Sequence, residues 1–222
     1  LLKMQSFAIV LQNVTKRFKD TEVLRNITVS FAEGKIHGIV GRNGSGKTVL
    51  FKCICGLMHP DKGAIIVQGK KVGLDVDIPK GVGAIIESPG FLPNFSGRKN
   101  LKFLADINKV VDEERIKECM SIVGLDYNCK KHVGKYSLGM RQRLGIAQAI
   151  MEKPNVLILD EPMNGLDNSG VKEMRDLLLK INSEGVTILL ASHNKDDIQA
   201  LCDTVLEMDH GQIIAIQTTP AD

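Results

Sequence analysis

Eight consecutive residues, from Gly41 to Thr48, have the types and spacing that could bind a phosphate chain: Gly-Arg-Asn-Gly-Ser-Gly-Lys-Thr. Three glycines let the backbone curl so that successive N–H groups point inward at an anion. Lys47 can reach the outer phosphates of a nucleotide, and the Thr48 hydroxyl can ligate Mg²⁺. We therefore expect a phosphate-binding loop for ATP and Mg²⁺, formed by Gly41, Arg42, Asn43, Gly44, Ser45, Gly46, Lys47, Thr48 and Val49.

The flanking segments suit this loop. The apolar run from Ile36 to Val40 predicts a buried strand, and apolar residues from Val49 to Leu57 recur at helical spacing. A strand, a glycine-rich loop and a helix form the context that the motif requires, and the helix would direct its positive N-terminal end at the anion. The alternative is a glycine-rich turn between core elements, which a matching acidic strand elsewhere would make less credible.

Such a strand follows at Val156–Leu159 and ends in Asp160 and Glu161. A buried strand that ends in two carboxylates needs a cation or hydrogen-bond donors, because removing acids from water is costly. Mg²⁺ at the phosphate-binding loop would supply that cation. We expect Asp160 to hold the metal with Thr48, and Glu161 to polarise a water molecule aimed at the γ-phosphate.

Three further residues have a functional and a structural interpretation. Phe18, in the predicted connection Lys16–Thr21, is either a nucleobase platform or an aromatic ring folded over the core. Ser137 precedes a helical segment and is either a simple N-cap or part of a second anion site. His193 follows the predicted strand Val186–Ala191 at the carboxyl end, where open α/β sheets bind ligands, although a lone histidine is more often structural.

Composition narrows the class of protein. The chain has 222 residues, 43% of them hydrophobic, and a net charge of +3 with scattered basic residues, so no nucleic-acid partner is expected. Five cysteines without a C-x-x-C pair predict reduced, mostly buried thiols in a cytosolic protein. The longest apolar run, Phe7 to Leu11, is far below the roughly 18 residues that span a bilayer. We expect no membrane span and no signal peptide.

Element patterns predict an α/β fold with an inserted helical region. Alternating residues in Phe7–Val14 and Val23–Phe31 indicate an antiparallel layer before the phosphate-binding loop. Helical periodicity without strand patterns marks Arg98–Ile107 and Glu113–Val123. We expect residues 1–87 and 154–222 to form the nucleotide-binding core and 88–153 a helical subdomain that ends with a loop at Tyr136–Met140.

The order of these motifs resembles the nucleotide-binding subunit of ATP-binding cassette (ABC) transporters, over Phe7 to about Ile216. The resemblance implies a RecA-like P-loop NTPase core with an antiparallel β subdomain and an inserted α-helical subdomain. It assigns adenine stacking to Phe18, a D-loop with Asp167 beside the nucleotide, and a switch histidine to His193. Tyr136–Met140 would be the signature loop, and Glu87 would occupy the Q-loop position as a catalytic and metal-facing residue.

In this family two subunits bind head to tail, so Ser137 and Gly139 of one would contact ATP on the other. The resemblance therefore implies a homo- or heterodimer that binds Mg²⁺ and ATP, hydrolyses ATP and drives integral membrane permease subunits. These would dock near Glu87–Ser96 and hold the chain on the inner face of the cell membrane.

The sequence departs from the family pattern at three places. Glu87 replaces the usual glutamine, Leu138 and Met140 replace a glycine and a glutamine of the signature, and Val49 follows Thr48 in place of a hydroxyl residue. The segments Glu87–Phe91 and Tyr136–Ala147 resemble the branch of bacitracin-resistance and lantibiotic-immunity exporters. Two alternatives remain: a soluble ATPase switch on ribosomes or DNA, and a cassette whose hydrolysis is slowed by the added charge of Glu87.

Overall fold

A computed structural model describes residues 6–218. The first five and last four residues of the predicted core, including Met4, lie outside the described residues. Two sheets organise the chain. The first contains β1 (Phe7–Phe18), β2 (Thr21–Ala32), β4 (Lys62–Val67) and β5 (Lys70–Lys71) in the antiparallel order β2-β1-β4-β5.

The second sheet has the order β10-β9-β3-β8-β7-β6. Its neighbours pair in parallel, apart from the antiparallel edge pair β9 and β10. Parallel strands align their carboxyl ends at one edge, which is where such sheets bind ligands. The strands are β3 (Ile36–Val40), β6 (Val82–Ile85), β7 (Val156–Asp160), β8 (Thr187–Ala191), β9 (Thr204–Asp209) and β10 (Gln212–Thr218).

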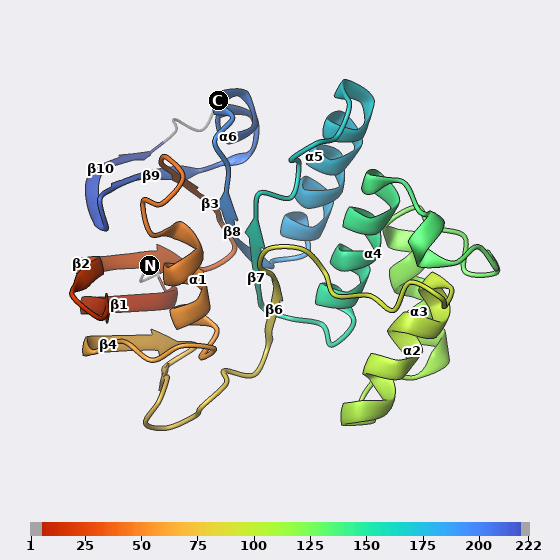
Figure 1. The fold of residues 1–222 in the computed structure, drawn as a ribbon, viewed down its shortest axis with the longest axis horizontal. Helices are drawn as coiled ribbons and strands as arrows, with labels where there is room; N and C mark the ends of the chain where they lie inside the picture. Colours follow the sequence, from red (N-terminus) through yellow and green to blue (C-terminus); the bar gives the residue numbers. More distant parts are fainter. Residues whose placement is uncertain (1–5, 219–222) are drawn as a thin grey trace, which may run out of the picture.

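Helices cover both faces of the parallel sheet. Helix α1 (Lys47–Ile54) lies between the two sheets, whereas the green and blue helices of Figure 1 lie across the parallel sheet from it. The remaining helices are α2 (Gly97–Asn108), α3 (Glu113–Ile122), the short 3₁₀ helix η1 (Val133–Lys135), α4 (Leu138–Ile150), α5 (Asn168–Ser183) and α6 (Lys195–Leu201). Helix α3 packs against both α2 and α4, and α4 packs against β6.

The buried apolar residues form two clusters, one on each face of the parallel sheet. Alternate residues of β7 divide between them: Ile158 faces the cluster that contains α1 and the antiparallel sheet, and Leu157 and Leu159 face the cluster of α2 to α6. This alternation follows from the two-residue period of a strand. The central strands are therefore buried on both faces, which fixes the position of the loops at their carboxyl ends.

The predicted α/β fold is confirmed, with local corrections. Phe18 is not in a loop: β1 extends to Phe18, which pairs with Thr21 across a two-residue connection. Helix α1 does not reach Leu57, because Gly56 adopts a φ of +74° and leaves Leu57 exposed. Residues Leu138–Met140 are not a loop either, since α4 begins immediately after its N-cap Ser137.

The cysteine prediction is confirmed in its structural part. All five cysteines lie among the described residues as free thiols, four buried and Cys129 half-buried. Burial raises the pKa of Cys53 to about 11 and that of Cys55 to about 12. Within residues 6–218, no helix has the length and apolar character to cross a bilayer.

Candidate functional site

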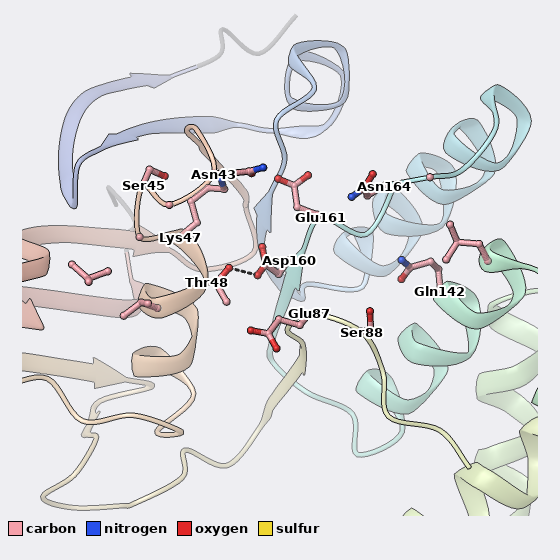
Figure 2. A pocket seen from close by; sticks show the side chains of 16 residues that line it. Asn43, Ser45, Lys47, Thr48, Glu87, Ser88, Gln142, Asp160, Glu161 and Asn164 are labelled. Carbon is pink, nitrogen blue, oxygen red and sulfur yellow. Dashed lines mark hydrogen bonds between the residues drawn. The ribbon is translucent and has the colours of Figure 1, made fainter. Parts of the chain in front are cut away.

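A pocket of about 530 Å³ opens where the phosphate-binding loop meets the carboxyl ends of β6 and β7. Figure 2 shows the side chains that line this pocket, among them Thr48 of α1, Asp160 of β7 and Gln142 of α4. Ten predicted site residues line it: Asn43, Gly44, Ser45, Gly46, Lys47, Thr48, Val49, Glu87, Asp160 and Glu161. The structure thus brings together segments more than a hundred residues apart in sequence.

The loop is built around an N-terminus of α1 that no side chain caps. Gly46 is the N-cap residue with a φ of +107°, and it offers no side chain to the orphan N–H groups of the first turn. A Cβ at Gly46 would lie 2.9 Å from the Val23 carbonyl oxygen, so both conformation and space require glycine here. The uncapped N–H groups face an anion site of the kind that phosphate occupies.

The loop has two buried polar side chains, and one of them, Lys47, can face a phosphate ligand. Among the described residues, Ser45 Oγ is a buried side-chain atom without a hydrogen-bond partner. Such an atom is costly unless a ligand or water satisfies it. The buried Lys47 ammonium donates to the carbonyl oxygens of Gly41 and Arg42, at 2.7 and 3.3 Å. Gly41 and Arg42 therefore do not line the pocket but hold its lysine.

Thr48 and Asp160 provide oxygen atoms for a cation. Thr48 Oγ1 donates to Asp160 Oδ2 at 2.6 Å, the dashed line in Figure 2. A hydroxyl and one carboxylate, both hard oxygen ligands, fit Mg²⁺, which completes its shell with water and phosphate oxygens. Residues 6–218 contain no cluster of three or more His, Cys, Asp or Glu side chains suited to a metal, so an all-protein metal cage is not present in the described part.

Glu161 and His193 form the second polar pair of the site. His193 Nδ1 lies 2.8 Å from Glu161 Oε2, and the His193 backbone N–H donates to the same oxygen at 3.3 Å. Glu161 has a φ of +53° and Glu87 a φ of +63°, each just after a parallel strand. Left-handed backbone at non-glycine residues is strained and concentrates at functional sites.

Strand β3 places the loop, and a buried histidine anchors that strand. The Nε2 of His37 lies 2.9 Å from the Ala32 carbonyl oxygen, and Nδ1 faces the Thr204 hydroxyl. Burial lowers the pKa of His37, although the Ala32 carbonyl acts in the opposite direction. A neutral imidazole therefore joins β2, β3 and β9 near the start of β3.

Seven predicted residues lie outside the pocket lining: Gly41, Arg42 and His193, which contact the lining residues Lys47 and Glu161, and four others. Phe18 is 43% exposed, with the Lys16 ammonium 5.8 Å from its ring centroid. Ser137 accepts a hydrogen bond from the Met140 N–H, and Asp167 accepts one from the Gly170 N–H, so each caps a helix. Gly139 lies beside them at the start of α4. In one chain, none of these four meets the phosphate-binding loop.

Six lining residues were not among the candidates from the sequence: Val23, Ser88, Leu138, Gln142, Asn164 and Gly165. Gln142 could have been found, because it lies one helical turn after Leu138, which also lines the pocket. Ser88 follows Glu87 directly. Val23 carries no signal in the sequence, since its place beside Gly46 depends on packing between the two sheets.

Comparison with known proteins identifies the family. The model of the family described as "ABC transporter" matches residues 24–164, which is more than half of the chain. The chain belongs to the ABC transporter family. It is an ATP-binding protein of that family, and the phosphate-binding loop, the strand before Asp160 and Glu161 fall within the matched residues.

Curated relatives of the ABC family cover most of the chain. An uncharacterized ABC transporter ATP-binding protein, YybJ of Bacillus subtilis, is 46% identical over 90% of this chain and 92% of its own length. The bacitracin transport ATP-binding protein BcrA of Enterococcus faecalis is 38% identical, over 96% of this chain and 70% of its own. The lantibiotic transport ATP-binding protein SrtF of Streptococcus pyogenes is 36% identical, over 92% and 88%. The predicted resemblance to this branch is confirmed.

The fold is shared with solved ABC cassettes. A dimeric post-hydrolysis structure of the ATP-binding cassette MJ0796, bound to ADP and phosphate, superposes with a TM-score of 0.85. It is 21% identical and covers 96% of this chain and 100% of its own. The likeness confirms the predicted P-loop NTPase fold of an ABC ATPase.

Proposed function

We propose that this ABC protein hydrolyses ATP and powers an exporter through a dimer of cassettes. The main support for the proposal is the arrangement at the pocket: an uncapped helix N-terminus and the Thr48–Asp160 pair line one cavity, and His193 contacts Glu161, which also lines it. Phosphoryl-transfer enzymes act mainly by positioning and charge stabilisation, and these groups supply both.

Each side chain would have a defined task. Lys47 would exchange the Gly41 and Arg42 carbonyls for the outer phosphates, and the loop N–H groups would hold the phosphate chain. Thr48 and Asp160 would hold Mg²⁺, which neutralises developing charge on the phosphates. Glu161 would accept a proton from the attacking water, while His193 keeps the carboxylate oriented. Phe18 would stack on adenine at the outer end of the site.

The signature residues would act on a second subunit. Ser137 is exposed at the N-terminus of α4, and Gly139 lies in its first turn, outside the pocket of their own chain. A helix N-terminus directed outward can meet the γ-phosphate bound to a partner. The MJ0796 cassette, described as a dimer with ADP and phosphate, is a precedent for such a pair. Asp167 would approach the partner's site in the same dimer.

Permease subunits would dock beside the Q-loop position. Glu87–Ser96 runs from the pocket to the N-terminus of α2, and it carries the exposed side chain of Leu92. We take residues 88–153 as a helical subdomain that would transmit the movement to the membrane partner. The chain would then lie on the cytoplasmic face of the membrane, and the names of BcrA and SrtF suggest a peptide antibiotic as cargo.

Two measurements test this proposal. The chain should hydrolyse Mg·ATP, and Lys47→Ala should remove both binding and hydrolysis because it removes the ammonium that faces the phosphates. The chain should also copurify with an integral membrane protein. Copurification with ribosomes or DNA in place of a membrane protein would contradict the transport assignment.

A further inference from the structure

Lys52 forms an ion pair with Glu87 at the edge of the pocket. Its Nζ donates to Glu87 Oε1 at 2.7 Å, and the two side chains are 30% and 64% exposed. Lys52 lies one helical turn after Thr48 on α1, so both face the ends of the parallel strands. Figure 2 shows the Glu87 carboxylate extended toward α1.

The ion pair offsets part of the negative charge at the pocket. Three carboxylates line the pocket, from Glu87, Asp160 and Glu161, and the expected ligand is itself polyanionic. Thr48 contacts Asp160, and His193 contacts Glu161, so each carboxylate has a separate partner. Lys52 is the cationic partner of Glu87 among the described residues.

The Lys52–Glu87 ion pair is expected to contribute little to the stability of the fold. Exposed ion pairs usually contribute little to stability, because water screens them and two long side chains lose freedom. Glu87 also has a left-handed backbone, which costs free energy. The backbone and the ion pair together direct the carboxylate toward α1 beside the pocket.

We propose that Lys52 is a positioning residue for Glu87. It neutralises the carboxylate and holds it on α1, so that Mg·ATP enters a site in which the Glu87 charge is already offset. The inference rests on the proposed function. It also predicts that the chain hydrolyses ATP in spite of its carboxylate at the Q-loop position.

The test is a double-mutant cycle with Lys52→Met, Glu87→Gln and the combined variant. Calorimetry measures the affinity of each variant for Mg·ATP and, in the presence of EDTA, for ATP without Mg²⁺. Lys52→Arg retains the charge, and Lys52→Gln repeats the removal of charge with another side chain. Lys35→Met is the matched control, because Lys35 pairs with Asp203 at the same 2.7 Å outside the pocket lining.

Lys52→Met should weaken Mg·ATP binding about 3- to 10-fold when residue 87 is glutamate, and less than about 2-fold when it is glutamine. Lys52→Arg should restore most of the affinity, and Lys35→Met should leave it unchanged. Equal losses in both backgrounds, or no loss in either, would overturn the inference. An unsubstituted chain that binds no Mg·ATP contradicts the proposed function instead, whereas binding without this coupling overturns the role of Lys52 alone.

Discussion

His193 Nδ1 lies 2.8 Å from Glu161 Oε2, although the two residues are 32 positions apart. They follow neighbouring parallel strands, since β7 ends at Asp160 and β8 at Ala191. The contact therefore depends on strand register, which aligns Asp160 with Ala191. It joins the proposed base to a ring that can hold its carboxylate in one orientation.

His193→Ala should lower kcat about 10- to 100-fold with little change in KM, because Glu161 loses the partner that orients it. In a Glu161→Gln background the same substitution should add little, since the two residues act as one unit. Steady-state ATPase measurements check both expectations. His210→Ala is the control, because His210 is 83% exposed and outside the pocket lining. Additive losses would contradict a shared role.

Ser137→Ala and Ser96→Ala remove the same hydroxyl from two helix N-caps. Ser137 accepts from the Met140 N–H and Ser96 from the Lys99 N–H. Each change should cost about 1 kcal/mol of unfolding free energy in urea titrations. Only Ser137→Ala should also slow ATP hydrolysis, because only Ser137 would contact a partner's γ-phosphate. Equal rates of ATP hydrolysis in the two variants would show that Ser137 acts only as a helix cap.

Ser45→Ala should affect the stability of the nucleotide-free protein but not the binding of ATP. Ser45 Oγ is buried without a partner, so removing it should leave the nucleotide-free chain equally stable or up to about 1 kcal/mol more stable. The same change should leave ATP binding nearly unchanged, because the buried oxygen is not accessible from the pocket. Thermal unfolding with and without ATP measures both effects. A destabilised nucleotide-free chain would contradict the expectation.

Acid should destabilise the fold through His37. Burial lowers the pKa of His37 from 6.5, so the folded state favours the neutral ring and the unfolded state binds more protons. The free energy of unfolding is not reduced by His37 above pH 6.5, and it decreases as the pH falls below that value. At pH 5.5 the loss is at most about 1.4 kcal/mol. Urea titrations at pH 7.5 and 5.5 should show a smaller difference for His37→Gln than for the unsubstituted chain.

Local patterns were enough to predict the fold class and the phosphate-binding loop. The Gly41–Thr48 motif, the apolar strand before Asp160 and the cap at Ser137 each depend on a few adjacent residues. Their chemistry limits the possible structures: glycine at Gly46 permits the positive φ, and a buried strand ending in acids requires a compensating partner.

Long-range contacts could not be predicted in the same way. The ion pair of Lys52 with Glu87 joins a helix to a loop 35 residues later, and no pattern in the sequence predicts that the two residues pair. The left-handed backbone at Glu87 and Glu161 is imposed by the sheet and not by residue type. Element ends were also misplaced at Phe18 and Leu57, where strand pairing and Gly56 outweigh hydrophobic spacing.

Light scattering of the Glu161→Gln chain with Mg·ATP tests most directly whether ATP is held between two copies of the chain. Without hydrolysis the pair should persist, so the mass should rise from 24.3 kDa to about twice that value on adding ATP. The further substitution Ser137→Ala should return the mass to that of the single chain. A chain that binds Mg·ATP and keeps the 24.3 kDa mass at all ATP concentrations would contradict the account.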